Sequence, residues 1–134
     1  MDVDVHIDRV ISILQKKKYS VGLDIEEILK LSADNNRVKI KAIIRFLDDS
    51  FLYYYEIVET GKCYPQVLKY SYQYMNGDDQ VFRYDDSPHH PDVSTFPHHK
   101  HVGRASIEQI VPAHQPKPDM LFEEIRQLIE NENM

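Results

Sequence analysis

The sequence predicts an α+β fold, an antiparallel β-meander of about four strands with N-terminal helices and one C-terminal helix. Apolar residues recur at helical spacing near both ends of the chain, and in the middle they alternate with polar residues. We expect a single domain over residues 1–134, because this length and a hydrophobic fraction of 42% suffice for one core. Its parts are a helical N-terminal part (1–36), an antiparallel sheet (37–86), a His/Pro-rich loop (87–118) and a C-terminal helix (119–131).

The N-terminal part carries two helix signals. Apolar residues lie on one face of residues 4–18, which end in three lysines that suit the negative end of a helix dipole. After Gly22, the pair Asp24 and Glu27 has the spacing of a capping box and predicts a second, short helix that ends at residues 33–36. The apolar faces are Ile7, Val10, Ile11 and Leu14 in the first helix and Ile25, Ile28, Leu29 and Leu31 in the second.

Four strands are predicted next. The stretch Arg37–Phe46 alternates with period two and has one basic face, and Phe51–Glu59 is rich in tyrosine and β-branched residues. Residues 67–75 and 80–85 form a third and a fourth strand, joined by Asn76-Gly77, which is the strongest short hairpin signal in the chain.

The stretch after the strands is unusually rich in histidine. Three prolines before residue 98 forbid regular helix there and favour a stiff extended loop. Asp119 then caps the last helix. Five of the seven histidines fall between residues 83 and 101: His89, His90, His98, His99 and His101. Because histidine changes protonation near neutral pH and is a frequent metal ligand, this segment is the candidate site.

One interpretation of the segment is acid-base cleavage of RNA. This reaction needs a base for the 2′-hydroxyl proton, an acid for the leaving oxygen and a cation for the charge on phosphorus. The candidate catalytic residues are Arg83, His90, His98, His99 and His101. Arg83 would bind the scissile phosphate, and the imidazoles would serve as acid and base without a metal or other cofactor.

Two other interpretations stay open. His99 and His101 share a face of an extended segment, and a third metal ligand could come from His89 or His90 with Asp85 or Asp86 nearby. The spacing matches no standard zinc motif. In the other interpretation, the histidines hydrogen-bond backbone groups of the loop and have a structural role only.

Candidate substrate-binding residues lie on the predicted sheet and beside the histidines: Lys39, Lys41, Tyr84 and Lys100. Basic strand residues can follow a phosphate backbone, and exposed tyrosines can stack on RNA bases. A solvated strand face and the general preference of strands for tyrosine explain the same residues. The net charge of −6 argues against a generally basic nucleic-acid scaffold but leaves room for a local basic face.

Other features bear on the compartment. The chain has no run of about 18 apolar residues and its acidic N-terminus lacks the features of a signal peptide. Cys63 is the only cysteine, so no internal disulfide can form. These features predict a cytoplasmic protein without a membrane span.

Several motifs resemble a known family. They are Lys-Tyr-Ser-Tyr-Gln-Tyr from Lys69, Phe-Arg-Tyr-Asp-Asp-Ser-Pro-His-His-Pro from Phe82 and Thr-Phe-Pro-His-His-Lys-His from Thr95, with the turn Phe-Leu-Asp-Asp-Ser-Phe-Leu from Phe46. They are similar to the TumE-like toxins of prokaryotic toxin–antitoxin systems. The family pattern has Asn-Ala where this chain has Asp86-Ser87, which adds a negative charge near the histidines.

The resemblance implies a helix-flanked antiparallel sheet and a toxin encoded beside its antitoxin. It favours the toxin component of a type II system, acting as a metal-independent ribonuclease by analogy with small toxins of similar layout. The N-terminal helices would hold the antitoxin or a second subunit. The alternative is a non-enzymatic protein- or metal-binding module that uses the Pro-His-His loop.

Overall fold

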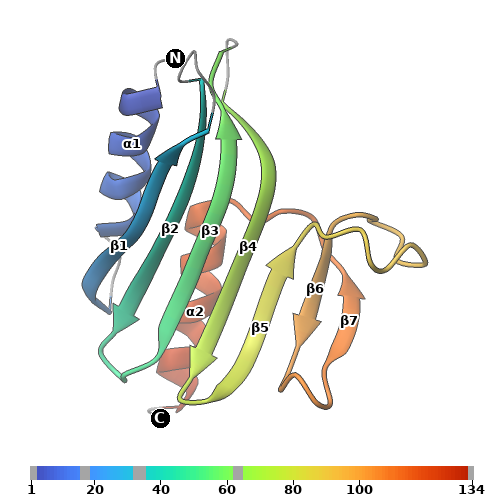
Figure 1. Cartoon of the computed structure of the whole chain (residues 1–134). Helices are drawn as coiled ribbons and strands as arrows, with labels where there is room; N and C mark the ends of the chain where they lie inside the picture. Colours follow the sequence, from blue (N-terminus) through green and yellow to red (C-terminus); the bar gives the residue numbers. More distant parts are fainter. Residues whose placement is uncertain (1–2, 16–18, 32–35, 62–64, 133–134) are drawn as a thin grey trace.

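The fold is known from a computed structural model, which describes residues 3–15, 19–31, 36–61 and 65–132. Seven strands form one antiparallel sheet in chain order, with a helix at each end of the chain (Figure 1). The elements are α1 (Val3–Gln15), β1 (Ser20–Lys30), β2 (Arg37–Phe46), β3 (Phe51–Glu59), β4 (Gln66–Asn76), β5 (Asp79–Asp85), β6 (His99–Val102), β7 (Gln109–Pro112) and α2 (Pro118–Glu132).

Most predicted elements are confirmed. The first and last helices and the four central strands are present, and Asn76-Gly77 joins β4 to β5 with Gly77 at a φ of 62°. The α+β class is therefore right, but the sheet has seven strands instead of about four. The three lysines at the predicted end of the first helix (16–18) lie outside the described residues. Of the predicted end of the second helix (33–36), residues 33–35 also lie outside them.

The predicted second helix is wrong, because its residues form β1. A β-bulge between Ile25 and Glu27 explains the error: Ile25 pairs with Ala42, while Ile28 pairs with Ile40. Ile25 and Ile28 are three residues apart on β1, but their partners on β2, Ala42 and Ile40, are only two residues apart. The extra residue of the bulge keeps both isoleucines on one face, and it gives the strand the spacing of a helix.

The predicted loop 87–118 is also partly wrong, because it contains β6 and β7. Each of these strands has only four residues, and β6 alternates histidine with lysine and valine instead of apolar with polar residues. A period-two hydrophobic signal is therefore missing. The two strands extend the sheet beyond β5, so the histidine segment is part of the sheet at this end.

Both helices lie on the same face of the sheet (Figure 1). The core between them and the strands includes residues of α1, α2 and the inward face of β2–β5: Ile7, Val10, Leu14, Ile40, Ile44, Leu52, Tyr70, Tyr72, Phe82, Leu121 and Ile125. The other face has no helix in the described part of the chain (Figure 1). No helix among the described residues is long and apolar enough to cross a membrane.

One carboxylate lies inside this core. Glu56 is 5% exposed and accepts hydrogen bonds of 2.6 Å from the hydroxyls of both Tyr54 and Tyr72. Burial raises the pKa of Glu56, and the two tyrosine hydrogen bonds oppose that rise. The core is thus partly polar, and its stability depends on the protonation of this group.

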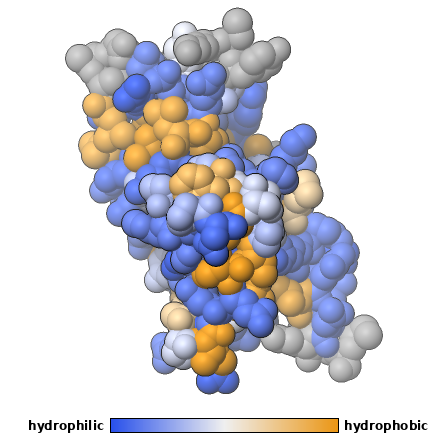
Figure 2. All heavy atoms as spheres, turned by 90° about the vertical axis from the view of Figure 1, so that its right-hand side faces the viewer, coloured by the Kyte–Doolittle hydropathy of each residue, from blue (hydrophilic) through white to orange (hydrophobic). Residues whose placement is uncertain are grey.

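The end of the molecule on the β7 side has a mixed surface. Figure 2 shows apolar groups separated by hydrophilic ones at this end. Three large apolar side chains near it are exposed: Phe96, Val102 and Ile107.

Candidate active site

Antiparallel pairing of β4, β5 and β6 builds the site. Arg83 on β5 is directly opposite His101 on β6, and Asp85 is opposite His99. On the other side of β5, Gln73 and Ser71 of β4 are opposite Arg83 and Asp85. Since residues two apart on a strand share a face, all six side chains lie on the face that the helices leave uncovered.

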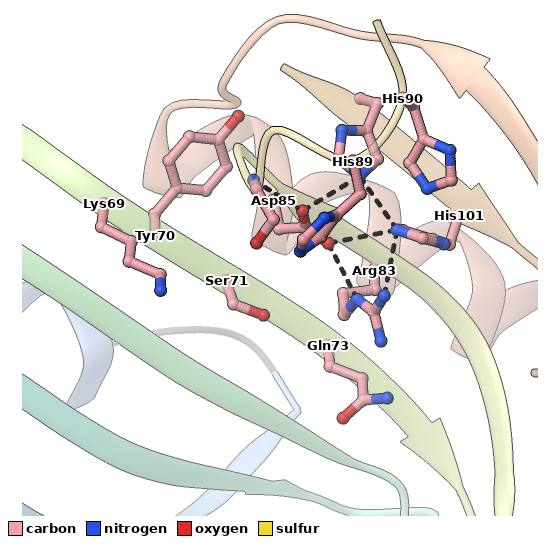
Figure 3. Close-up of a pocket in the computed structure, with 11 residues that line it drawn as sticks. Lys69, Tyr70, Ser71, Gln73, Arg83, Asp85, His89, His90 and His101 are labelled. Atoms are coloured by element: carbon pink, nitrogen blue, oxygen red, sulfur yellow. Dashed lines mark hydrogen bonds and ion pairs between the residues drawn. The ribbon is translucent and has the colours of Figure 1, made fainter. Parts of the chain in front are cut away.

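These side chains border a pocket of about 280 Å³ (Figure 3). We call it the histidine pocket and define it by its lining: Lys69, Tyr70, Ser71, Gln73, Arg83, Asp85, Ser87, His89, His90, His99 and His101. Ser87, His89 and His90 come from the loop between β5 and β6, while the other residues project from β4, β5 and β6.

Asp85 is the centre of the cluster. Its Oδ2 lies 2.9 Å from Arg83 Nε and 3.2 Å from His101 Nε2, and its Oδ1 lies 3.0 Å from His99 Nε2. The backbone N–H of Ser87 also donates to Oδ1. Burial would raise the pKa of Asp85, but the Ser87 and Arg83 hydrogen bonds outweigh it and the pKa is lowered. The group is therefore a carboxylate at neutral pH.

The two buried imidazoles, those of His99 and His101, are each held by a hydrogen bond at Nδ1. His99 Nδ1 lies 2.9 Å from the Pro97 carbonyl oxygen, and His101 Nδ1 lies 2.9 Å from Glu108 Oε1. The two Nε2 atoms are 3.0 Å apart, and Arg83 Nη2 lies 3.0 Å from His101 Nε2. Burial lowers the pKa of His101 although the Glu108 hydrogen bond opposes this, so the neutral ring is favoured.

His90 completes a group of three imidazoles. Its ring centre is 4.9 Å from that of His99 and 5.6 Å from that of His101. One ring nitrogen from each of the three residues lies within 4.8 Å of the others. Four of the five predicted catalytic residues, Arg83, His90, His99 and His101, therefore surround one pocket.

The fifth, His98, is elsewhere. Its ring stacks on Tyr70 with centres 5.8 Å apart, and its Nδ1 lies 2.9 Å from the Tyr70 hydroxyl. It does not line the histidine pocket. Adjacent residues of an extended segment point to opposite sides, so a His-His pair directs only one ring to a given face.

The predicted substrate-binding residues are divided between the two faces of the sheet. Tyr84 and Lys100 point toward α2, where the Tyr84 hydroxyl and Lys100 Nζ each lie 2.6 Å from Glu124. Lys39 and Lys41 of β2 lie on the uncovered face, since Lys41 is linked to Ser71 through Tyr55 in the strand register. Lys39 forms a 2.5 Å ion pair with Glu27.

The predicted site lacks several residues that the structure places in or beside the pocket. The sequence indicates Asp85 only as a possible metal ligand, and it gives no indication of Lys69 and Gln73 in the pocket lining or of Glu108 behind His101. Glu108 precedes β7 and is held by Gln80 Nε2 as well as by His101. The period-two spacing of Arg83 and Asp85 indicates that both side chains lie on one face of a strand. It does not show that they meet the histidines, because the pairing of β5 with β6 joins residues that are distant in sequence.

Comparison with known families gives one finding. Residues 12–133 match the model of a family described as Toxin TumE. Comparison with curated proteins and with solved structures gives no match.

Proposed function

The chain belongs to the TumE toxin family, and we propose that it is the toxin of a type II toxin–antitoxin pair that cuts RNA at the histidine pocket. Membership of the family implies a cognate antitoxin as its partner. The observation that supports RNA cleavage is the convergence of a guanidinium and three imidazoles on one open pocket. When a 2′-hydroxyl attacks its own phosphodiester, the reaction requires these groups as base, acid and cation.

His101 is the proposed general base. Its Nδ1 is bound to Glu108, so the neutral ring carries its proton there and directs its Nε2 lone pair to the pocket side, 3.0 Å from Arg83 Nη2. A carboxylate behind an imidazole fixes the orientation of the ring and stabilises the imidazolium that forms. His90, half-buried at the rim, is the proposed acid for the leaving oxygen.

Arg83 is the proposed phosphate-binding group. Asp85 fixes the guanidinium through Nε, and the side chain remains 33% exposed on the pocket side. His99 is 2% exposed and bound to both Pro97 and Asp85, so we assign it a positioning role. Lys69 adds a second positive charge at the pocket.

The uncovered face continues from the pocket toward β2 as a path for the RNA strand. Lys41, Tyr55, Ser71 and Asp85 follow one another across neighbouring strands. With strands about 4.8 Å apart, Lys41 lies roughly 14 Å from Asp85. Lys41 Nζ lies 5.8 Å from the centre of the Tyr55 ring, so a cation and an aromatic ring stand together on this path. A single RNA strand of a few nucleotides would reach from the histidine pocket to Lys41 and Tyr55.

RNA turnover tests this proposal. We expect the full chain to cleave a labelled RNA oligonucleotide in the presence of a chelator, and His101→Gln to lose about 100-fold or more of that rate. His114→Gln, which changes an exposed histidine outside the pocket, should retain the rate. Thermal melting of each variant separates lost chemistry from lost folding. Absence of turnover by the wild type, or equal turnover by His101→Gln, would reject the proposal.

The alternative is a non-enzymatic module in which the same segment binds a protein or a metal ion. The close approach of His90, His99 and His101 favours its metal-binding form. Under this alternative the wild type would bind a partner or a metal and turn over no RNA.

A further inference from the structure

The protonation of the two buried imidazoles follows from their outer partners. A carbonyl oxygen only accepts, so the His99 Nδ1 that faces Pro97 carries a proton. The His101 Nδ1 that faces Glu108 carries one for the same reason, because the oxygens of a carboxylate only accept. In the neutral rings both Nε2 atoms are then bare lone pairs.

The His99 lone pair faces other electron-pair donors, whereas the His101 lone pair also faces the Arg83 guanidinium, whose Nη2 lies 3.0 Å from it. His99 Nε2 lies 3.0 Å from His101 Nε2 and 3.0 Å from Asp85 Oδ1, and both of those atoms are acceptors. The His99 ring is only 2% exposed, so water has little access to it. Two bare nitrogens and a carboxylate repel one another unless a proton or a metal cation lies between them. The geometry thus has a place for a cation at this point.

The distances suit a transition metal ion. Bonds of about 2.0–2.1 Å to a tetrahedral Zn²⁺ put neighbouring ligand atoms about 3.3 Å apart. His99 Nε2 lies 3.0 Å from His101 Nε2 and 3.0 Å from Asp85 Oδ1, and His101 Nε2 lies 3.2 Å from the other carboxylate oxygen, Asp85 Oδ2. His90, on a loop and half-buried, has a ring nitrogen within 4.8 Å of the other two histidine ligands and can close the fourth position by a small movement.

The outer partners also suit a metal site. Metal-bound imidazoles usually donate their second N–H to a carbonyl or a carboxylate, and Pro97 and Glu108 supply one of each. Three nitrogens and one oxygen favour Zn²⁺ and its neighbours among the transition metals over Mg²⁺ or Ca²⁺.

We propose that Asp85, His90, His99 and His101 form a binding site for a zinc-like transition metal ion, and that its occupancy switches off RNA cleavage at the same pocket. The regulatory half of this inference rests on the proposed function. Four protein ligands fill a tetrahedral site and leave no position for a reactive water, as in structural zinc sites. The ion would also occupy the His101 Nε2 lone pair and displace Arg83 Nη2, which lies 3.0 Å from it. The bound ion would therefore remove the general base, His101, and the phosphate-binding group, Arg83, from the reaction together.

Binding can be tested without any activity measurement. The full chain is stripped with a chelator, dialysed and titrated with CoCl₂, whose visible absorption reports tetrahedral coordination, and then with ZnCl₂, which should displace the cobalt. We expect one ion per chain. His90→Ala, which leaves the buried imidazoles in place, should bind at least tenfold more weakly, and His114→Ala should bind as the wild type does. Absence of a tetrahedral cobalt spectrum, or equal binding by His90→Ala, would overturn the site.

Turnover of RNA then tests the regulatory half. We expect cleavage in chelator and its loss on addition of one equivalent of ZnCl₂, with recovery when chelator is restored. Cleavage that requires the ion, or that is unaffected by it, would overturn inhibition. A normal cobalt titration with no cleavage in either state would retain the site but reject the proposed function together with its regulation.

Discussion

Replacement of Lys100 by methionine separates a structural role of this residue from a substrate-binding one. Lys100 Nζ lies 2.6 Å from Glu124 of α2, and it stands 5.2 and 4.9 Å from the ring centres of Phe82 and Tyr84. Methionine keeps the apolar stem over the two rings and removes the charge. The expected result is a loss of stability with unchanged RNA turnover.

The size of the loss follows from the burial of the pair. The Lys100 and Glu124 side chains are 19% and 30% exposed. Exposed ion pairs contribute up to about 1 kcal/mol, while hydrogen bonds to buried charged groups contribute about 1.5–3 kcal/mol. A pair between these limits should contribute about 1–2 kcal/mol to the free energy of unfolding, measured by urea denaturation.

Lys69→Met is the matched comparison, because Lys69 is exposed and lines the histidine pocket. It should change the free energy of unfolding by less than about 0.5 kcal/mol and weaken RNA binding, with less weakening at high salt. The reasoning is refuted if Lys100→Met leaves stability intact and weakens RNA binding instead. Lys100 would then contact the substrate, as the sequence suggested.

Four further substitutions test the fold, one of them as a control. Burial raises the pKa of Glu56 in the folded state, so the wild type should lose stability as the pH rises above the ordinary value of 4.5, and Glu56→Gln should lack this loss when unfolding is measured across that pH. Ile125→Ala, at a side chain of α2 that is 0% exposed, should cost about 2–4 kcal/mol in urea denaturation, whereas Met120→Ala, at 64% exposure on the same helix, should cost less than about 0.5 kcal/mol. Gly103 has a φ of 96°, so Gly103→Ala should lower the free energy of unfolding by about 1–2 kcal/mol; a variant as stable as the wild type would contradict the strain assigned to this position.

Local patterns in the sequence were sufficient for the middle of the sheet and for both helices. The alternation in β2 and the Asn-Gly turn after β4 are signals within a few residues, and the structure confirms them. The bulge in β1 produced helical spacing in a strand, so the same reasoning gave the wrong element there. Strands β6 and β7 have four residues each, too few for a period-two hydrophobic pattern to be recognised.

The number of histidines in one segment indicated where the candidate site lies, but not how its side chains are arranged in space. The shared face of His99 and His101 follows from period two alone. The partners do not, because Asp85 meets His99 only through the pairing of β5 with β6 across 13 intervening residues (86–98). The same pairing turns Tyr84 and Lys100 toward α2, away from the pocket.

The most direct measurement of the proposed chemistry uses a DNA oligonucleotide that carries one ribonucleotide. If the imidazoles of the histidine pocket activate a 2′-hydroxyl, the wild type in chelator should cut only after that nucleotide and leave a 2′,3′-cyclic phosphate on the upstream product, and Arg83→Gln should reduce that cut without altering the ends. Cleavage at deoxynucleotides, upstream products ending in a free 3′-hydroxyl, or an intact oligonucleotide would contradict the assignment.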